Sequence, residues 1–383
     1  MQIETTKKIK VGIVGLGLRG RLMAHLVHDM VDSLELAAVC DTSLEKWETF
    51  ITAEDPVPIS QKYPEVKFFT DACEMFDSGL IEAAIIETPA YHHVKFCEEA
   101  LKRDLHVFGE IPPVADLHEA KRLWDAVQNS KGMFMVGANP NRTGFVRGLQ
   151  DFANAGLLGE IFFMEAEYIH DLRHLWKVSP WRQMPENTPI KYCTHSLGPL
   201  LSILNEDLRT VYCTGTGSRI ADHQCTDLMS AQFQTENKVI VRLMVSFVNA
   251  NRHGMHSYRV FGSNGCFERF SERGKQPPKV FFNSSKLYGM KEMAELAVDR
   301  EPVEYRLRPD ILASGHEGTD YDLLKIFGEA LLTDKKSPIT IKDGLRMTLP
   351  GIFADASAKM GGKVLTIHYP WDEDFNPAEL DLV

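Results

Sequence analysis

The chain has 383 residues, 44% of them hydrophobic and 25% charged, which is typical of a globular protein large enough for two domains. Its formal net charge of −11 argues against nucleic acid as a main partner, because phosphate binding requires a basic surface. The sequence has neither an apolar run of about 18 residues nor a secretory pattern at its start, so we expect no membrane partner and a cytoplasmic location.

The first third of the chain alternates short apolar strands with helices. The predicted strands are Lys10–Val14, Leu36–Cys40, Val66–Phe69, Ala83–Ile86, His106–Phe108 and Met133–Val136. The predicted helices between them include Leu22–Met30, His93–Lys102 and Leu117–Asn129. This alternation is typical of a parallel, doubly wound sheet covered on both faces. We therefore predict an α/β Rossmann domain over residues 1–137.

From about Gly137 the strands follow one another with few helices between them. The predicted strands are Glu160–Ile169, Thr210–Gly215, Asp227–Gln234, Val239–Phe247, Tyr258–Gly262 and Cys266–Phe270, and the third and fourth of these read as a hairpin. The predicted helices are Thr143–Ala155, Gly318–Leu332 and Ile341–Met360, and Ser271–Pro278 is a predicted loop. We predict an α+β domain over 138–383 with a large, mostly antiparallel sheet, and we expect helix 341–360 to pack near the first domain.

A glycine pattern follows the first strand. Gly15, Gly17 and Gly20 in VGIVGLGLRG form G-x-G-x-x-G between a strand and a helix, and Asp41 ends the second strand. These glycines allow a tight turn and a close approach to a pyrophosphate, whereas the carboxylate accepts hydrogen bonds from ribose hydroxyls. This carboxylate would repel a 2′-phosphate, so we predict NAD as the cofactor. Arg19 is either placed over the pyrophosphate or solvated at the start of the helix.

The seven cysteines, at positions 40, 73, 97, 193, 213, 225 and 266, form no C-x-x-C pair. Their odd number and wide spacing predict reduced thiols rather than a disulfide framework. The segment EAEYIHDLRH at 165–174, at the end of the strand Glu160–Ile169 and after it, offers Glu165, Glu167, His170 and His174 as metal ligands, but strand alternation puts the two glutamates and His170 on opposite faces. We therefore predict no metal site. Asp171 and Arg173 are expected to form a structural ion pair.

Four segments carry a resemblance: GIVGLGLRG at 12–20, TPAYHH at 88–93, HVFGEIPP at 106–113 and GLLGEI at 156–161. With them the chain resembles the glucose–fructose oxidoreductase / inositol dehydrogenase (Gfo/Idh/MocA) family. Dehydrogenases of that family have Glu-Lys-Pro after the fifth strand, where the lysine assists proton movement at the substrate hydroxyl. Here the three residues are Glu110, Ile111 and Pro112.

Further segments resemble a narrower branch, the NAD-dependent α-N-acetylgalactosaminidases, whose members have a Glu-Val-Pro-like variant. The matching segments are EYIHDLR at 167–173, WR at 181–182 and YCTHSLGPL at 192–200. The chain departs from that branch at Cys193, which replaces a proline, in the shorter spacing between Trp181 and Tyr192, and in Asn139–Arg142. It also has no counterpart in register for a substrate tyrosine before the turn at 262–265, although Tyr258 lies nearby.

The resemblance implies a cofactor site and a carbohydrate site. With the glycines above, the implied cofactor-binding residues are Arg19, Asp41, Thr88, Ala90, His93, Glu110, Ile111 and Asn139. The implied substrate-binding residues are Tyr168, Arg182 and Thr194, with Tyr192 and His195 as catalytic residues; we add His170, at the end of the strand that carries Tyr168. The resemblance also implies a homo-oligomer.

The reaction implied by the resemblance leaves no net redox change. A sugar is oxidised at C3, deprotonated at C2, loses its C1 substituent, takes up water and is reduced again. Imidazole and phenol suit the proton steps because their surroundings can move their pKa values toward neutral pH. Tyr192 and His195 are three residues apart and share a face in a helical turn. For the reaction that the resemblance implies, we predict Tyr192 as the base at C2 and His195 as the group at O3.

Two other functions are compatible with the sequence. One is an NAD-dependent sugar or polyol dehydrogenase or 3-keto-sugar reductase, in which His195 replaces the missing lysine as proton carrier. The other is a non-enzymatic NAD-binding sensor, for which the polar residues of YCTHSLGP are a poor fit.

Overall fold

The computed structural model describes residues 7–52, 55–177, 179–220, 225–249, 255–269, 279–283, 293–297, 302, 305 and 307–380. The chain forms two compact units, Met1–Asn139 with Val303–Leu345 and Pro140–Pro302 with Arg346–Val383. The predicted loop Ser271–Pro278 lies outside the described residues. Among the described residues, no helix is both long enough and apolar enough to cross a membrane.

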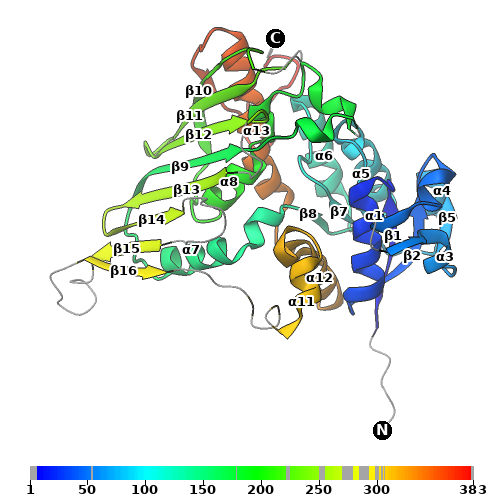
Figure 1. Ribbon diagram of the computed structural model, residues 1–383. Helices are drawn as coiled ribbons and strands as arrows, with labels where there is room; N and C mark the ends of the chain where they lie inside the picture. Colours follow the sequence, from blue (N-terminus) through cyan, green and yellow to red (C-terminus); the bar gives the residue numbers. More distant parts are fainter. Residues whose placement is uncertain are drawn as a thin grey trace. The chain divides into compact units, whose positions relative to one another are not determined.

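The first unit is built on a six-stranded sheet in the order β5-β2-β1-β6-β7-β8, in which every pairing is parallel (Figure 1). Its strands are β1 (Ile9–Val14), β2 (Leu34–Cys40), β5 (Lys67–Phe69), β6 (Ala83–Ile86), β7 (His106–Gly109) and β8 (Phe134–Val136). The residues of β6 and β8 are all buried, as expected for strands covered on both faces. The predicted Rossmann architecture is confirmed.

The helices of the first unit connect these strands. They are α1 (Leu18–His25) with a π-helical turn (Leu26–Met30), α2 (Leu44–Trp47), α3 (Ile59–Lys62), α4 (Ala72–Asp77), α5 (His93–Leu101) and α6 (Leu117–Asn129). Side chains fix two of the helix starts, because Asp71 caps α4 and Asp116 accepts a hydrogen bond from the Glu119 N–H at 2.8 Å to cap α6. A small hairpin, β3 (Phe50–Thr52) and β4 (Asp55–Pro58), was not predicted.

A segment late in the sequence also belongs to the first unit. It contains α11 (Pro309–Ala313), α12 (Thr319–Leu332) and the first residues of α13 (Ile341–Lys359). The ring of Phe327 packs edge-on against Phe108 of β7 at 5.6 Å, and the Val136 N–H donates to the Ile339 carbonyl at 3.0 Å. The units therefore differ from the predicted division at 137/138, because the apolar face of α12 is buried against the Rossmann strands.

The second unit is built on a nine-stranded sheet in the order β16-β15-β14-β13-β9-β12-β11-β10-β17 (Figure 1). Its strands are β9 (Ile161–Ile169), β10 (Leu208–Gly215), β11 (Leu228–Thr235), β12 (Ile240–Ser246), β13 (Met255–Gly262), β14 (Gly265–Arg269), β15 (Lys279–Asn283), β16 (Met293–Ala297) and β17 (Leu365–Thr366). The central pair β9–β12 is parallel and the other pairings are antiparallel. The prediction of a mostly antiparallel sheet is confirmed, and so is the hairpin β11–β12.

Buried residues alternate along β11, which shows that one face of this sheet is packed and the other is more open. The helices of the unit include α7 (Gly144–Asn154), α8 (Thr194–Leu201) and the larger part of α13. Helix α8 contacts β9 and β13. The Tyr258 hydroxyl of β13 donates a 2.7 Å hydrogen bond to the His195 carbonyl of α8, which fixes the start of this helix on the sheet.

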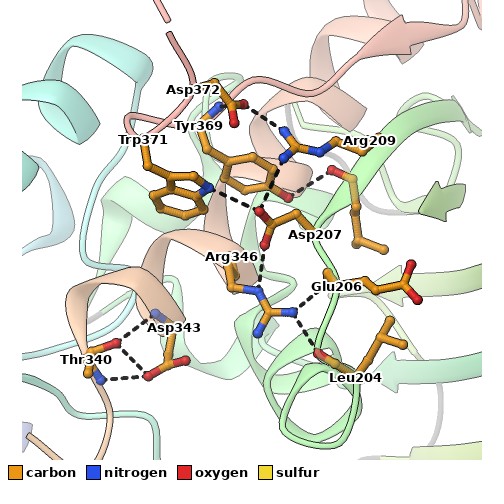
Figure 2. A network of polar contacts seen from close by, with 11 residues as sticks. Leu204, Glu206, Asp207, Arg209, Thr340, Asp343, Arg346, Tyr369, Trp371 and Asp372 are labelled. Atoms are coloured by element: carbon orange, nitrogen blue, oxygen red, sulfur yellow. Dashed lines mark hydrogen bonds and ion pairs between the residues drawn. The ribbon is translucent and has the colours of Figure 1, made fainter. Parts of the chain in front are cut away.

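A part-buried polar network connects three segments of the second unit (Figure 2). Asp207 accepts hydrogen bonds from Arg346 Nε at 2.9 Å and from Trp371 Nε1 at 3.0 Å. Arg209 Nη1 donates to Asp372 at 2.7 Å. The network joins the start of β10, helix α13 and the C-terminal segment. The seven cysteines are all free, as predicted.

Candidate functional site

The glycine loop between β1 and α1 has the backbone that a dinucleotide site requires. Gly15 has a φ of +95°, which favours glycine, and a Cβ at this position would lie 2.7 Å from the Glu87 carbonyl. A Cβ at Gly20 would lie 1.8 Å from the Gly15 carbonyl, whereas a Cβ at Gly17 would meet nothing within 4 Å. The first and third glycines are therefore needed for packing, and the second leaves the loop open to a ligand.

Asp41 lies beside this loop at the end of β2. Its Oδ2 accepts a hydrogen bond from the Leu16 N–H at 2.8 Å, and its Oδ1 accepts one from the Ser43 N–H at 3.0 Å. The two backbone donors fix the carboxylate between the glycine loop and the next turn. This is the place at which a ribose hydroxyl donor would reach it.

Arg19 is neither solvated nor free. Its side chain is 22% exposed; Nη2 donates to Asp320 Oδ1 at 2.9 Å, and Nη1 makes a short bond to Oδ2 of the same residue. Glu87 lies 3.8 Å from Nε and Glu110 lies 3.6 Å from Nη2. The solvated alternative is thus wrong, and this guanidinium is surrounded by three carboxyl groups.

The charge state of this group follows from burial. Burial and the neighbouring Glu110 raise the pKa of the fully buried Glu87 well above its usual value, although Arg19 opposes the rise. This shift favours the protonated form of Glu87. The pKa of Asp320 is lowered even though it is buried, because Arg19 and His316 stabilise its charged form.

His93 connects the loops after β6 and β7, and Ile111 lies in the second of these loops. The buried His93 ring lies 2.7 Å from the Thr88 carbonyl through Nε2 and 2.9 Å from the Pro112 carbonyl through Nδ1. The Ile111 side chain is buried, and the peptide bond that follows it is cis. Ala90 is half-buried at the start of a 3-10 turn, Ala90–His92. His93 thus joins the two loops at the carboxyl edge of the sheet.

A second group of predicted residues meets in the second unit, around Tyr168 of β9. We call it the Tyr168 cluster, and its members are Tyr168, His170, Tyr192, His195, Phe247 and His256. The Tyr168 ring lies 5.3 Å from that of His195, 4.4 Å from that of His256 and 6.3 Å from that of Phe247. The cluster brings together four of the predicted substrate-site and catalytic residues.

Tyr192 and His195 lie next to each other, as their spacing predicts. Their ring centroids are 4.8 Å apart and the rings are perpendicular, although Tyr192 ends a 3-10 turn, Pro189–Tyr192, and His195 lies in α8. The Tyr192 ring is 5.7 Å from that of Tyr168. Tyr192 is half-buried and His195 is buried, with 9% of its surface exposed.

Burial sets the protonation of Tyr168 and His170. Burial and the nearby Tyr192 raise the pKa of Tyr168 well above its usual value, against the opposing charge of Arg182, so this phenol remains a hydrogen-bond donor. Burial lowers the pKa of His170, which favours a neutral imidazole. Thr194 is buried at the start of α8. Arg182 is half-buried in a 3-10 turn, Pro180–Gln183.

Sequence reasoning missed four residues of these groups: Glu87, Phe247, His256 and Asp320. Strand alternation offered a signal for His256, because it lies two residues before Tyr258 on the same face and directly opposite Tyr168 across β9 and β13. Glu87 directly precedes the Thr-Pro motif. No local pattern marks Asp320, which meets Arg19 across 301 positions of sequence.

Of the potential metal ligands on β9 and after it, Glu165 has charged partners and His174 contacts the Asp171 carbonyl at 2.9 Å. Glu165 pairs with Arg242 and Arg259, and Asp171 forms the predicted ion pair with Arg173 at 2.6 Å. Among the described residues, potential ligand atoms converge in one place outside the predicted site, at His368, Asp372 and Asp374. Asp372 there is already paired with Arg209 (Figure 2), whose positive charge opposes a cation.

Two family profiles match the chain. The profile described as an oxidoreductase family with an NAD-binding Rossmann fold, GFO_IDH_MocA, matches residues 9–138. The profile of the GFO/IDH/MocA C-terminal domain matches residues 146–268. The first match contains the glycine loop, and the second contains all members of the Tyr168 cluster.

Curated relatives extend the comparison. The chain is 25% identical over 362 residues to a glycosyl hydrolase family 109 protein of Bacteroides thetaiotaomicron, covering 84% of this chain and 76% of that protein. It is 26% identical over 211 residues to an alpha-N-acetylgalactosaminidase of Shewanella oneidensis, covering 51% of this chain and 44% of that protein.

Solved structures share the fold. A myo-inositol 2-dehydrogenase from Lactobacillus plantarum superposes with a TM-score of 0.73 at 17% identity, covering 94% of this chain and all of that one. A levoglucosan dehydrogenase in complex with NADH and L-sorbose superposes with a TM-score of 0.76 at 16% identity, covering 95% of this chain and all of that one.

Proposed function

Because this chain belongs to the Gfo/Idh/MocA family, we propose that it is an NAD-dependent glycoside hydrolase that acts without net redox change. The observation that carries the proposal is the contact between Tyr192 and His195, whose perpendicular rings lie 4.8 Å apart beside Tyr168. The names of the curated relatives support it, since they are glycosyl hydrolase family 109 proteins and an alpha-N-acetylgalactosaminidase.

The first unit holds the cofactor in this proposal. Bound NAD would supply a hydride acceptor that oxidises C3 of the sugar and later returns the hydride. The open backbone at Gly17 would allow the pyrophosphate to approach, and the Asp41 carboxylate would accept hydrogen bonds from the ribose hydroxyls. Since a 2′-phosphate would lie against this carboxylate, the proposed cofactor is NAD rather than NADP.

The second unit supplies the proton steps. His195 holds the proton of the C3 hydroxyl, and Tyr192 removes the proton from C2 once C3 is a ketone. The half-buried phenol of Tyr192 suits a base better than that of Tyr168, because burial keeps Tyr168 protonated. Tyr168, His170, Arg182 and Thr194 hold the sugar, and a buried, protonated phenol is a suitable donor to a sugar oxygen.

The second candidate is a sugar or polyol dehydrogenase or a 3-keto-sugar reductase. It would need a proton carrier in place of the lysine that Ile111 replaces. His195 is the residue for that role, because its backbone is fixed by Tyr258 and its ring contacts two tyrosines. In this reaction the base at C2 has no task, so the two candidates differ in what they require of Tyr192.

One assay separates them. The protein is incubated with NAD and a panel of nitrophenyl glycosides, and both nitrophenol release and NADH absorbance are followed. Nitrophenol release without accumulating NADH is the expected result. Stoichiometric NADH without release would establish the dehydrogenase, and NAD binding with neither signal would leave only a sensor. A cytoplasmic homo-oligomer is part of the same proposal, and light scattering tests the oligomeric state.

A further inference from the structure

A buried acid at the start of α12 binds two of the residues predicted to hold the cofactor. The Asp320 side chain is completely buried. Besides the two bonds from Arg19, its Oδ1 accepts a hydrogen bond from Asn139 Nδ2 at 3.3 Å. His316 Nδ1 lies 2.8 Å from its Oδ2. The Asp320 carboxylate thus contacts a guanidinium, an amide and an imidazole.

The turn before α12 brings these groups together. Gly315, His316, Glu317 and Gly318 have φ values of +105°, +45°, +56° and +85°, so four consecutive residues have a positive φ and two of them are not glycine. Such a conformation costs roughly 1–2 kcal/mol for each non-glycine residue and persists only where surrounding contacts impose it. A Cβ at Gly315 would lie 3.0 Å from both Asp320 Oδ2 and Leu22 Cδ2, which places the turn directly against α1.

The distances show why Asp320, of the three carboxyl groups, fixes the position of Arg19. Glu87 lies 3.8 Å from Arg19 Nε, and Glu110 lies 3.6 Å from Arg19 Nη2, both beyond hydrogen-bond distance. Asp320 alone engages both terminal nitrogens of the guanidinium, and a two-bond pair fixes both position and plane. Without Asp320, Arg19 would have to reorient toward Glu110, which lies 3.6 Å away and does not bond both terminal nitrogens of the guanidinium.

We propose that Asp320 is a positioning residue for the cofactor, which it acts on by holding Arg19 and Asn139 in place beside the glycine loop. The inference rests on the proposed binding of NAD. It adds to the dinucleotide site a residue from a segment that lies about 180 positions after the last Rossmann strand. In this proposal the segment with α12 completes the dinucleotide site, because it supplies the carboxylate that fixes Arg19.

The test is the dissociation constant of NAD, measured by titration calorimetry without any sugar. Asp320→Asn removes the charge and one of the two bonds while keeping the size, so we expect NAD to bind about ten- to a hundredfold more weakly. Asp310→Asn is the matched control, because Asp310 is exposed and pairs only with Arg308 among the described residues. NAD affinity in this control should equal that of the unchanged protein.

A double-mutant cycle separates positioning from general loosening. If Asp320 acts through Arg19, the combination of Asp320→Asn with Arg19→Lys should weaken binding less than the product of the single effects. Additive effects, or wild-type affinity in a folded Asp320→Asn, would overturn the inference. Should Asp320→Asn fail to fold, Asp320→Glu, which keeps the charge but displaces it, is held to the same criteria.

These outcomes are distinct from a failure of the proposed reaction. If the protein binds NAD but cleaves no glycoside, the glycosidase proposal is refuted. The role of Asp320 is then still decided by the NAD titration. An unchanged protein that binds no NAD refutes both.

Discussion

At the scale of single residues, the hydroxyl of Tyr192 is the group on which the proposed elimination depends. Tyr192→Phe keeps the ring that packs against His195 and Phe247 and removes only the proton acceptor. We expect deuterium exchange at C2 of the recovered sugar to vanish and glycoside cleavage to fall by about 10²- to 10⁴-fold, the usual range for loss of a general base. NMR of sugar recovered from heavy water measures the exchange.

The control for this variant is Tyr212→Phe, because Tyr212 lies on β10 and is 46% exposed. NAD affinity should be the same in both variants. Exchange at C2 that persists at the wild-type rate in Tyr192→Phe would remove Tyr192 from the role of base and favour the oxidoreductase reading.

His170 gives the second prediction at this scale, through pH. Burial lowers its pKa below the value of about 6.5 that a histidine has in an unfolded chain. As the pH falls through about 6.5, the unfolded state therefore takes up this proton before the folded state, so the free energy of unfolding decreases. When the pH is lowered from about 7.5 to about 5.5, we expect the free energy of unfolding to decrease less in His170→Gln than in the unchanged protein.

Urea denaturation at the two pH values measures this difference. His174→Gln is the control, since His174 is exposed four residues away. An equal pH dependence in the unchanged protein and in His170→Gln would show that the imidazole of His170 is not the group responsible.

At the scale of elements, the β1–α1 loop separates two roles of glycine. Gly20→Ala places a Cβ 1.8 Å from the Gly15 carbonyl and must distort the loop, so we expect a loss of about 1–3 kcal/mol in stability as well as of NAD affinity. Gly17→Ala meets no atom within 4 Å, and Gly17 has a φ of −61°, which alanine adopts easily. We therefore expect Gly17→Ala to keep its stability and to lose NAD affinity.

Thermal unfolding and NAD titration of both variants measure the two roles. Each variant serves as the control for the other. If Gly17→Ala bound NAD as tightly as the unchanged protein, the loop would not approach the pyrophosphate at Gly17, and the proposed placement of the cofactor would have to change.

Elements with a local signature were predictable from the sequence. Ala83–Ile86 and Leu117–Asn129 have the predicted bounds, because the patterns of a buried strand and of a capped amphipathic helix are local and lie within consecutive residues. The strand Met293–Ala297 was missed, because it contains none of the β-branched or aromatic residues that mark strands. Helix Thr319–Leu332 was found, but its place in the first unit depends on contacts with residues such as Phe108 that are distant in sequence.

The candidate sites divide in the same way. The glycine loop and Asp41 follow from spacing alone. Tyr192 and His195 were selected by resemblance, and their spacing then predicted that they meet. His256 of β13 joins its cluster through the register of the sheet, and Asp320 of α12 meets Arg19 through packing between distant segments. No short window of sequence contains either contact.

At the scale of the whole molecule, the two units each contain an ion pair, and the burial of each pair determines how much it stabilises the protein. Asp207 belongs to the second unit, is 15% exposed and binds Arg346 of α13 and Trp371 of the C-terminal segment (Figure 2). Removing one partner of a mostly buried pair leaves the other charge without compensation, at a cost of about 3–5 kcal/mol. We expect Asp207→Ala to destabilise the protein by that amount.

The exposed pair of Asp77 and Arg103 in the first unit provides the comparison. Asp77 is 62% exposed, and exposed pairs contribute only about 0–1 kcal/mol, so Asp77→Ala should be close to neutral. If the two units unfold in separate steps, calorimetry should show that Asp207→Ala lowers one transition, while NAD, which binds the first unit in our proposal, raises the other. Ligand at a hundred times its dissociation constant stabilises the binding unit by about 2.7 kcal/mol. Equal losses in Asp207→Ala and Asp77→Ala would show that the part-buried network contributes no more than a surface pair.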